Sequence, residues 1–170
     1  MKSRCNVTLI ALTVIGISAP GIALEVASPD GNLVVTFEVK DFGAIAGCPC
    51  YRVDYKERPV IGESRLGLDL DGITLSEGLA VVEHTACRHD STWKPVCGER
   101  AEIRDCCNQV VIRLKEVKAP GRILCVTFRV YDEGVAFCYT LPKQPGLDNA
   151  RVKREVSEFR FLSDHAVWAT

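Results

Sequence analysis

The fold class is decided by residues 122–140, RILCVTFRVYDEGVAFCYT, which form two apolar runs around one turn. Successive side chains of a strand point to opposite faces, so apolar residues at every second position predict a half-buried strand. Asp132-Glu133-Gly134 between the runs is a typical turn sequence. The stretch therefore predicts an antiparallel hairpin. Its apolar faces are formed by Leu124, Val126, Phe128 and Val130 in the first strand and by Val135, Phe137 and Tyr139 in the second.

The same two-residue period recurs on both sides of this hairpin. Turn sequences separate the runs, at residues 29–32 (PDGN), 71–72 (DG) and 119–121 (APG). No window of a dozen residues carries the apolar stripe of a helix. We therefore predict an all-β fold, an antiparallel β-sandwich, with a weaker pattern from residue 141 onward. The further runs are residues 33–39, 51–55, 66–70 and 110–114, with Phe159 and Phe161 closing the pattern.

The first residues indicate export. Lys2 and Arg4 precede an uncharged apolar run over residues 7–17, and small residues follow up to Ala23. We predict a signal peptide over residues 1–23 and a domain over residues 24–170, located in the periplasm or secreted. An uncleaved anchor is the alternative, but a membrane-spanning helix needs about 20 apolar residues. No second long apolar stretch exists, so we expect no membrane association after cleavage.

Net charge and cysteine placement argue against two further properties, nucleic-acid binding and a framework of disulfides. The formal net charge is −1, and the basic residues are spread among the acidic ones, which argues against a nucleic-acid partner. Eight cysteines follow Cys5, and an even number in an exported chain favours disulfides. The placement of these cysteines does not favour disulfides. Two of them are adjacent, two flank a proline, and two lie inside strand-like runs. We predict that most of these thiols are unpaired, because free cysteine also behaves as a small buried apolar residue.

Candidate chemistry is sparse. His84, Cys87, His89 and Cys97 are soft metal ligands, but their spacing is irregular for a zinc site, so exposed loop histidines are the preferred interpretation. Ser64 lies in a sequence that starts like a nucleophile elbow but lacks its closing glycine. We therefore predict no metal site and a strand-edge serine.

Acidic pairs are the chemistry that glycoside cleavage requires. Glu99 and Glu102 form one candidate pair, whereas Asp132 and Glu133 are better explained as hairpin-turn residues. Trp93 begins the segment that leads to Glu99, and together they form a candidate carbohydrate-binding surface. A packed turn with Trp93 in the core is the commoner alternative, because large aromatic residues are mostly buried.

Five blocks of this sequence resemble the N-terminal domain of glycoside hydrolase family 97. They occur in the order of the family pattern and cover almost all of the predicted domain. They are residues 28–33 (SPDGNL), 59–68 (PVIGESRLGL), 93–99 (WKPVCGE), 128–137 (FRVYDEGVAF) and 155–161 (EVSEFRF). Cys97 and Cys107 stand where the family pattern has an aromatic residue, and Cys138 where it has arginine, which again argues against a disulfide framework.

The resemblance implies a galactose mutarotase-like β-super-sandwich that precedes a catalytic barrel in the same chain. The family's barrel hydrolyses α-glucosides or α-galactosides and holds calcium. We therefore expect carbohydrate as the ligand, and neither a catalytic residue nor a cofactor in this chain. Calcium is expected only in a full-length enzyme. The apolar residues up to Thr170 suggest a sandwich that is incomplete at its C-terminal end. The alternatives are a stand-alone carbohydrate-binding module and an independent mutarotase-like enzyme, for which no His–Glu pair is recognisable.

Overall fold

The computed structural model describes residues 23–147, 149–164 and 166. These residues contain strands and no helix, which confirms the predicted all-β sandwich. The strands are β1 (Leu24–Ala27), β2 (Leu33–Phe42), β3 (Ile45–Tyr55), β4 (Arg58–Arg65), β5 (Leu68–Leu70), β6 (Ile73–Leu75), β7 (Leu79–Trp93), β8 (Ile103–Glu116), β9 (Ile123–Val130), β10 (Val135–Thr140) and β11 (Val152–Glu155).

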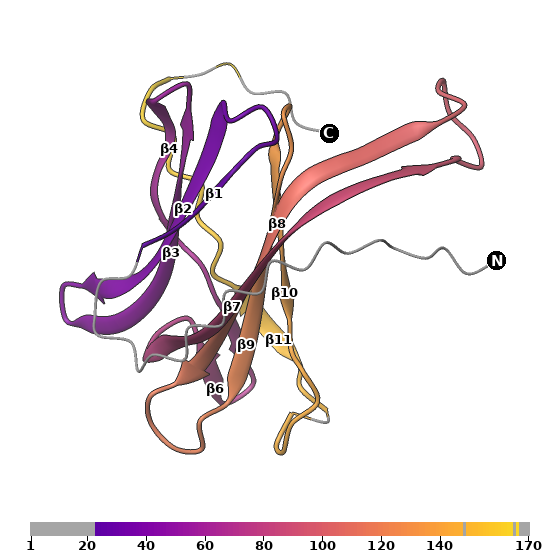
Figure 1. The fold of residues 1–170 in the computed structure, drawn as a ribbon. Coiled ribbons are helices and arrows are strands. Elements are labelled where there is room, and N and C mark those ends of the chain that lie inside the picture. The colour runs from indigo at the N-terminus through magenta and orange to yellow at the C-terminus, as the bar shows by residue number, and fades with distance from the viewer. Residues whose placement is uncertain (1–22, 148, 165, 167–170) are drawn as a thin grey trace.

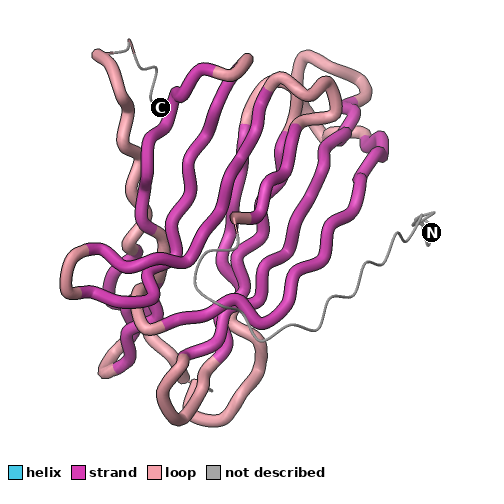
Figure 2. The backbone as a smooth tube through the Cα atoms, turned by 60° about the vertical axis from the view of Figure 1, so that its left-hand side comes forward, coloured by secondary structure: helices cyan, strands magenta, loops and turns pink. Residues whose placement is uncertain are grey.

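The strands form three sheets, and every pairing between them is antiparallel. One four-stranded sheet has the order β1-β2-β3-β4 and the other has the order β10-β9-β8-β7. They lie on either side of the molecule in Figure 1, and Figure 2 shows their strands running side by side. A small sheet, β11-β5-β6, lies at one end.

The core lies between the sheets and follows the two-residue period. Phe37 in β2 contacts Phe128 in β9, with 6.1 Å between their ring centroids. Phe128 also lies 5.8 Å from the rings of Tyr51 and Phe137. Burying such side chains is the main stabilising contribution to a domain of this size. The predicted faces of β8 and β9 are all buried, namely Val110, Ile112, Leu114, Leu124, Val126, Phe128 and Val130.

Three parts of the strand prediction need correction. The histidines and cysteines of residues 84–89 lie in the long strand β7 and not in a loop. Phe161 makes only an isolated bridge to Ile61, so residues 159–161 are not a regular strand. β11 was not predicted; its own residues are all exposed, and it pairs with β5. The Asp132–Glu133 turn is confirmed, because the Tyr131 N–H donates to the Gly134 carbonyl at 2.8 Å.

The turn between β1 and β2 is organised around the carboxylate of Asp30. Ser28 Oγ donates to it at 2.5 Å, and the backbone N–H of Asn32 donates at 3.0 Å. The Asp30 N–H donates to Asp132 Oδ1 at 2.8 Å, which joins this turn to the β9–β10 turn. The hydrogen bond from Ser28, followed by that from Asn32, lowers the pKa of Asp30 from 3.8 to about 2.

This pKa predicts how stability depends on pH. A carboxyl whose pKa is lower in the folded state stabilises the fold above its unfolded pKa and loses that effect as the pH falls. We expect the Asp30 contribution to be complete above about pH 4 and lost towards pH 2. Melting temperatures of the parent and of Asp30→Asn should therefore differ near neutral pH and converge in this acid range. A difference that stays constant down to pH 2 would contradict the assignment.

The eight described cysteines form no disulfide with one another. Burial raises the pKa of four of these thiols, and the pKa of Cys50 rises to about 11. At neutral pH such thiols are almost entirely protonated, so little of the reactive thiolate form is present. The four are Cys48, Cys50, Cys107 and Cys125.

Residues 1–22 of the predicted signal peptide, as well as Val167 and Trp168, lie outside the described residues. Export and cleavage after Ala23 stay predictions. Within the described ranges, no helix has the length and hydropathy needed to cross a membrane.

Candidate functional site

A two-stranded ribbon extends from the second sheet. β8 pairs with β9 only from Asn108 to Lys115, whereas its pairing with β7 continues to Trp93 opposite Ile103. We call residues 89–107 the arm. Figure 1 shows it projecting well beyond the body of the molecule. A two-stranded ribbon is only marginally stable in water, so its cross-strand contacts matter.

Ion pairs connect the two strands of the arm. Arg104 donates to both carboxylate oxygens of Asp90, from Nε at 2.8 Å and from Nη2 at 2.6 Å. This hydrogen bonding lowers the pKa of Asp90. Lys94 and Glu102 form a second, more exposed pair at 3.3 Å. Exposed pairs of this kind add little stability each, but both connect the two sides of the ribbon.

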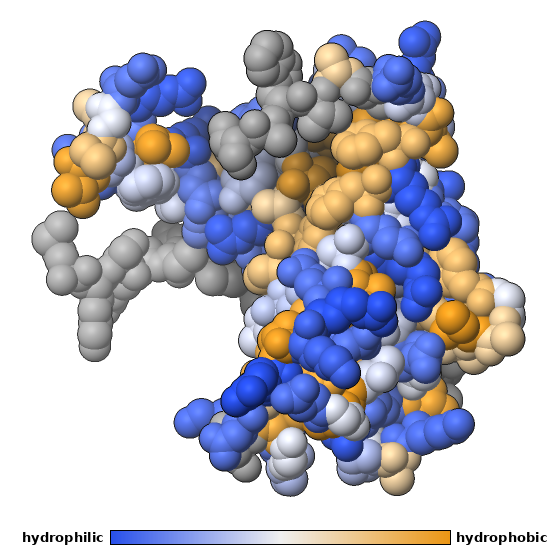
Figure 3. Space-filling model, turned by 180° about the vertical axis from the view of Figure 1, so that it is seen from behind, coloured by the Kyte–Doolittle hydropathy of each residue, from blue (hydrophilic) through white to orange (hydrophobic). Residues whose placement is uncertain are grey.

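The predicted surface residues lie at the outer end of the arm. Trp93 is 51% exposed, so the alternative of a core tryptophan is wrong. Glu99 lies in the connecting loop and is exposed, and Val96 beside it is fully exposed. Figure 3 shows hydrophilic side chains along the arm and an apolar spot at its end. Exposed aromatic and apolar groups at such a position are typical of a contact surface.

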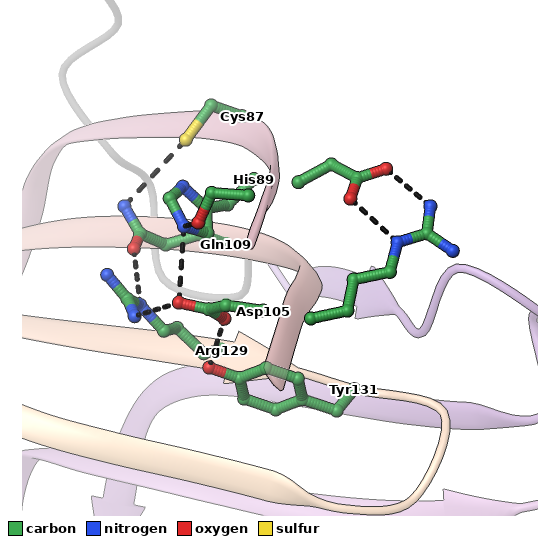
Figure 4. Close-up of polar contacts among 9 residues, drawn as sticks. Cys87, His89, Asp105, Gln109, Arg129 and Tyr131 are labelled. Atoms are coloured by element: carbon green, nitrogen blue, oxygen red, sulfur yellow. Dashed lines mark hydrogen bonds and ion pairs between the residues drawn. The ribbon is translucent and has the colours of Figure 1, made fainter. Parts of the chain in front are cut away.

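A polar cluster lies where the arm joins the sheet, on the face away from the core (Figure 4). Asp105 is its centre: it accepts a hydrogen bond from Tyr131 Oη at 3.0 Å and contacts His89 Nε2 at 3.2 Å. Arg129 Nη1 lies 3.5 Å from the same carboxylate, and its Nε donates to Gln109 Oε1 at 2.8 Å. Burial raises the pKa of Tyr131, which keeps its hydroxyl protonated as a donor.

The cluster contains a hydroxyl, an imidazole and a carboxylate, but not in a relay. Ser91 Oγ lies 3.0 Å from His89 Nε2, the same nitrogen that contacts Asp105. A nucleophilic triad needs the hydroxyl on one ring nitrogen and the acid on the other. The cluster is therefore arranged to hold the arm against β9 and not to activate Ser91.

The candidate pair Glu99 and Glu102 does not resemble the arrangement of a glycosidase. Glu102 is paired with Lys94, and Glu99 lies in an exposed loop. A general acid for glycoside cleavage is usually kept protonated by an apolar pocket. The exposed position of Glu99 supplies no such environment.

The side chains of the candidate metal ligands do not converge on one point. His84 pairs with Ile112 and Cys87 with Gln109 along β7, and an odd spacing in a strand places side chains on opposite faces. Among the described residues, no three acidic, histidine or cysteine side chains are close enough to hold a metal ion.

Sequence reasoning singled out His89 only as a possible metal ligand and missed its partner Asp105. The members of the cluster come from three strands, with His89 in β7, Asp105 in β8 and Arg129 in β9. Their proximity depends on strand register, which apolar alternation alone does not fix when both faces of a ribbon are exposed.

Asp105→Asn tests the role of the cluster. Removing this charge weakens the contacts with Arg129 and His89 at a site that is 22% exposed, so we expect a loss of about 1–2 kcal/mol in unfolding free energy. Urea denaturation followed by circular dichroism measures it. Asp90→Asn is the matched control and should cost clearly less than Asp105→Asn, because its pair with Arg104 is exposed. Equal losses would show that Asp105 is an ordinary surface acid.

Comparisons with known proteins agree with this fold. The family model for the glycosyl-hydrolase 97 N-terminal domain matches residues 26–170. A glycoside hydrolase family 97 enzyme from Pseudoalteromonas sp. strain K8, solved with panose, is 28% identical with a TM-score of 0.74. The match covers 82% of this chain and 20% of that chain, and the same enzyme with acarbose gives a TM-score of 0.73.

A β-arabinopyranosidase is similar to the same degree, at 29% identity and a TM-score of 0.73, over 81% of this chain and 21% of that chain. The chain thus spans about a fifth of the length of these enzymes. Because the family model matches residues 26–170, this chain belongs to the glycosyl-hydrolase 97 N-terminal family.

Proposed function

We propose that this chain serves as the non-catalytic, carbohydrate-binding and structural N-terminal domain of an exported glycoside hydrolase of the α-glucosidase or α-galactosidase type. The observation that carries the proposal is the family match over residues 26–170 together with the 20% share of the enzyme it resembles. The remaining four fifths of such an enzyme supply its other domains, and a catalytic barrel in the same chain is the partner we propose.

The similar enzymes favour small saccharides as ligands. One was solved with panose and with acarbose, and another is a β-arabinopyranosidase. On this chain, exposed Trp93 at the end of the arm is the best candidate to contact a sugar, because the face of an indole ring packs well against the C–H groups of a pyranose. Glu99 in the same loop would accept hydrogen bonds from sugar hydroxyls.

Localisation and metal content follow from the same proposal. The basic start, the apolar run and the small residues before Leu24 favour export to the periplasm or the medium. We propose that calcium is bound by the barrel of the full-length enzyme and not by this domain.

The proposal predicts that the chain alone does not hydrolyse aryl α-glucosides, α-galactosides or β-arabinopyranosides, with or without calcium. Glycoside cleavage needs two carboxyl groups held about 5–9.5 Å apart across the scissile bond. Binding a sugar without a positioned acid leaves the barrier almost unchanged. Release of the aryl alcohol, followed by absorbance, measures the activity.

Glu99→Gln is the decisive variant in this assay. Turnover in the parent that disappears in Glu99→Gln would make this domain an enzyme and refute the proposal. Turnover that is equal in both proteins would trace to a contaminating hydrolase, and repurification should then remove it.

A further inference from the structure

A second surface, on the face of the first sheet away from the core, has the features of a ligand site. An open cleft of about 730 Å³ lies over β1, β2, β3 and the turn that follows β3. Its volume is in the range of small-molecule sites, about 300–1,000 Å³. Thr36 lies in the middle, paired with Glu25 in β1 and with Arg52 in β3, so the three side chains share the face away from the core.

The hydroxyl of Thr36 is the first independent observation. Thr36 is 3% exposed, and its Oγ1 has no hydrogen-bond partner among the described residues. A buried hydroxyl without a partner is costly, and native structures contain few of them. The floor of the cleft therefore holds a donor and acceptor that the fold itself leaves unused.

The β3–β4 turn is the second observation. Tyr55 pairs with Arg58, which leaves Lys56 and Glu57 as a two-residue loop with φ values of 50° and 62°. Such loops favour Asn-Gly because each residue adopts a left-handed conformation. Both side chains line the cleft. Strained residues of this kind concentrate at functional sites.

The charged residues that line the cleft indicate which class of ligand it favours. Three acidic side chains and two basic ones line it, which does not favour a phosphate or another anion. Among the described residues, no three acidic side chains converge as a metal ion would require. Arg52 Nε lies 3.5 Å from Asp54 Oδ2, so a forked donor and a carboxylate acceptor stand side by side. Alternating donors and acceptors spread over a cleft match the vicinal hydroxyls of a neutral sugar.

We propose that this cleft binds a neutral mono- or disaccharide, with Arg52 and Asp54 on adjacent hydroxyls and the Thr36 hydroxyl engaged by the bound sugar. The choice of a saccharide rests on the proposed function, but the cleft and the arm are separate sites. Arg52 is half exposed, so its side chain is free to move and open the floor to the ligand.

The test is a titration of the full ¹⁵N-labelled chain with galactose and maltose, followed by amide chemical shifts. We expect shifts at Thr36, Arg52 and Asp54 at millimolar sugar. Arg52→Ala should weaken binding about tenfold or more, because it removes a charged hydrogen-bond donor. Arg113→Ala is the matched control: it removes an exposed arginine from β8, outside the cleft, and should leave these shifts unchanged.

Thr36→Val gives a second readout that does not depend on knowing the best sugar. Removing an unpartnered buried hydroxyl should raise the melting temperature by about 2–4 °C and weaken binding about fivefold or more. A lower melting temperature would show that the hydroxyl is already satisfied and would refute the inference. Sugar-induced shifts confined to Trp93 and its neighbours would refute the cleft while keeping the proposed function. Shifts at neither site would refute both.

Discussion

Replacing Gly67 with alanine is expected to cost at least about 3 kcal/mol of unfolding free energy, a large part of the stability of a domain this size. Gly67 lies between β4 and β5 with φ at +150°, a conformation that L-residues rarely adopt. A Cβ there would lie 2.4 Å from Ser76 Cα and 2.8 Å from the Leu75 carbonyl oxygen. Both neighbours are backbone atoms of a buried segment, so neither can move aside without moving the small sheet.

The backbone at Gly67 also connects distant parts of the chain. Its N–H donates to Tyr139 Oη at 3.0 Å, and its carbonyl accepts from the Val156 N–H at 2.9 Å. A displacement at this residue therefore weakens the contacts of β10 and of the segment after β11. Urea denaturation followed by far-ultraviolet circular dichroism measures the loss.

Gly72→Ala is the matched control for Gly67→Ala. Gly72 also has a positive φ, of 73°, but a Cβ there meets no atom within 4 Å. This variant should cost only about 1 kcal/mol, the price of the left-handed conformation alone. Equal losses in the two variants would show that conformation, and not the clash with Ser76, dominates at Gly67.

Phe128→Ala is expected to cost about 3–5 kcal/mol. The Phe128 ring is fully buried and touches the rings of Phe37, Tyr51 and Phe137, which belong to both large sheets. Its removal leaves a cavity at the centre of the sandwich, and the surrounding strands cannot collapse into it without breaking their register.

Phe161→Ala removes the same number of atoms from a ring that is 48% exposed. We expect a loss below about 1 kcal/mol for this control. Circular dichroism suits both measurements better than tryptophan fluorescence, because half-exposed Trp93 lies at the end of the arm and reports poorly on the core. A loss for Phe128→Ala no larger than that for Phe161→Ala would contradict the described core.

A strand can be predicted from this sequence when one of its faces packs in the core. In β9 every second residue is fully buried, so Leu124 and Phe128 alternate with partly exposed residues and the strand is evident from sequence. The outer half of β7 has exposed residues on both faces, and its run of His84, Thr85 and Ala86 therefore shows no alternation. β11 is exposed along its whole length and was missed for the same reason.

Of the candidate sites, only the one formed by Trp93 and Glu99 could be predicted from the sequence. Trp93 and Glu99 lie in one short segment of the sequence, and this was enough to suggest them as a pair. The Asp105 cluster joins three strands, and the Thr36 cleft needs β1, β2 and β3 in register. Such sites follow from strand pairing, which a single sequence specifies only where the hydrophobic pattern is strong.

The small sheet has a consequence for the order in which the chain acquires its structure. β5 and β6 are three residues each, and two strands of this length do not persist alone in water. Their third strand is β11, whose Arg154 binds Asp69 across 85 residues of sequence. Closing so long a loop is slow compared with forming the neighbouring hairpins. During synthesis, β5 therefore keeps an open edge until residue 155 has been made. We therefore expect the small sheet to form after the hairpins of the two large sheets.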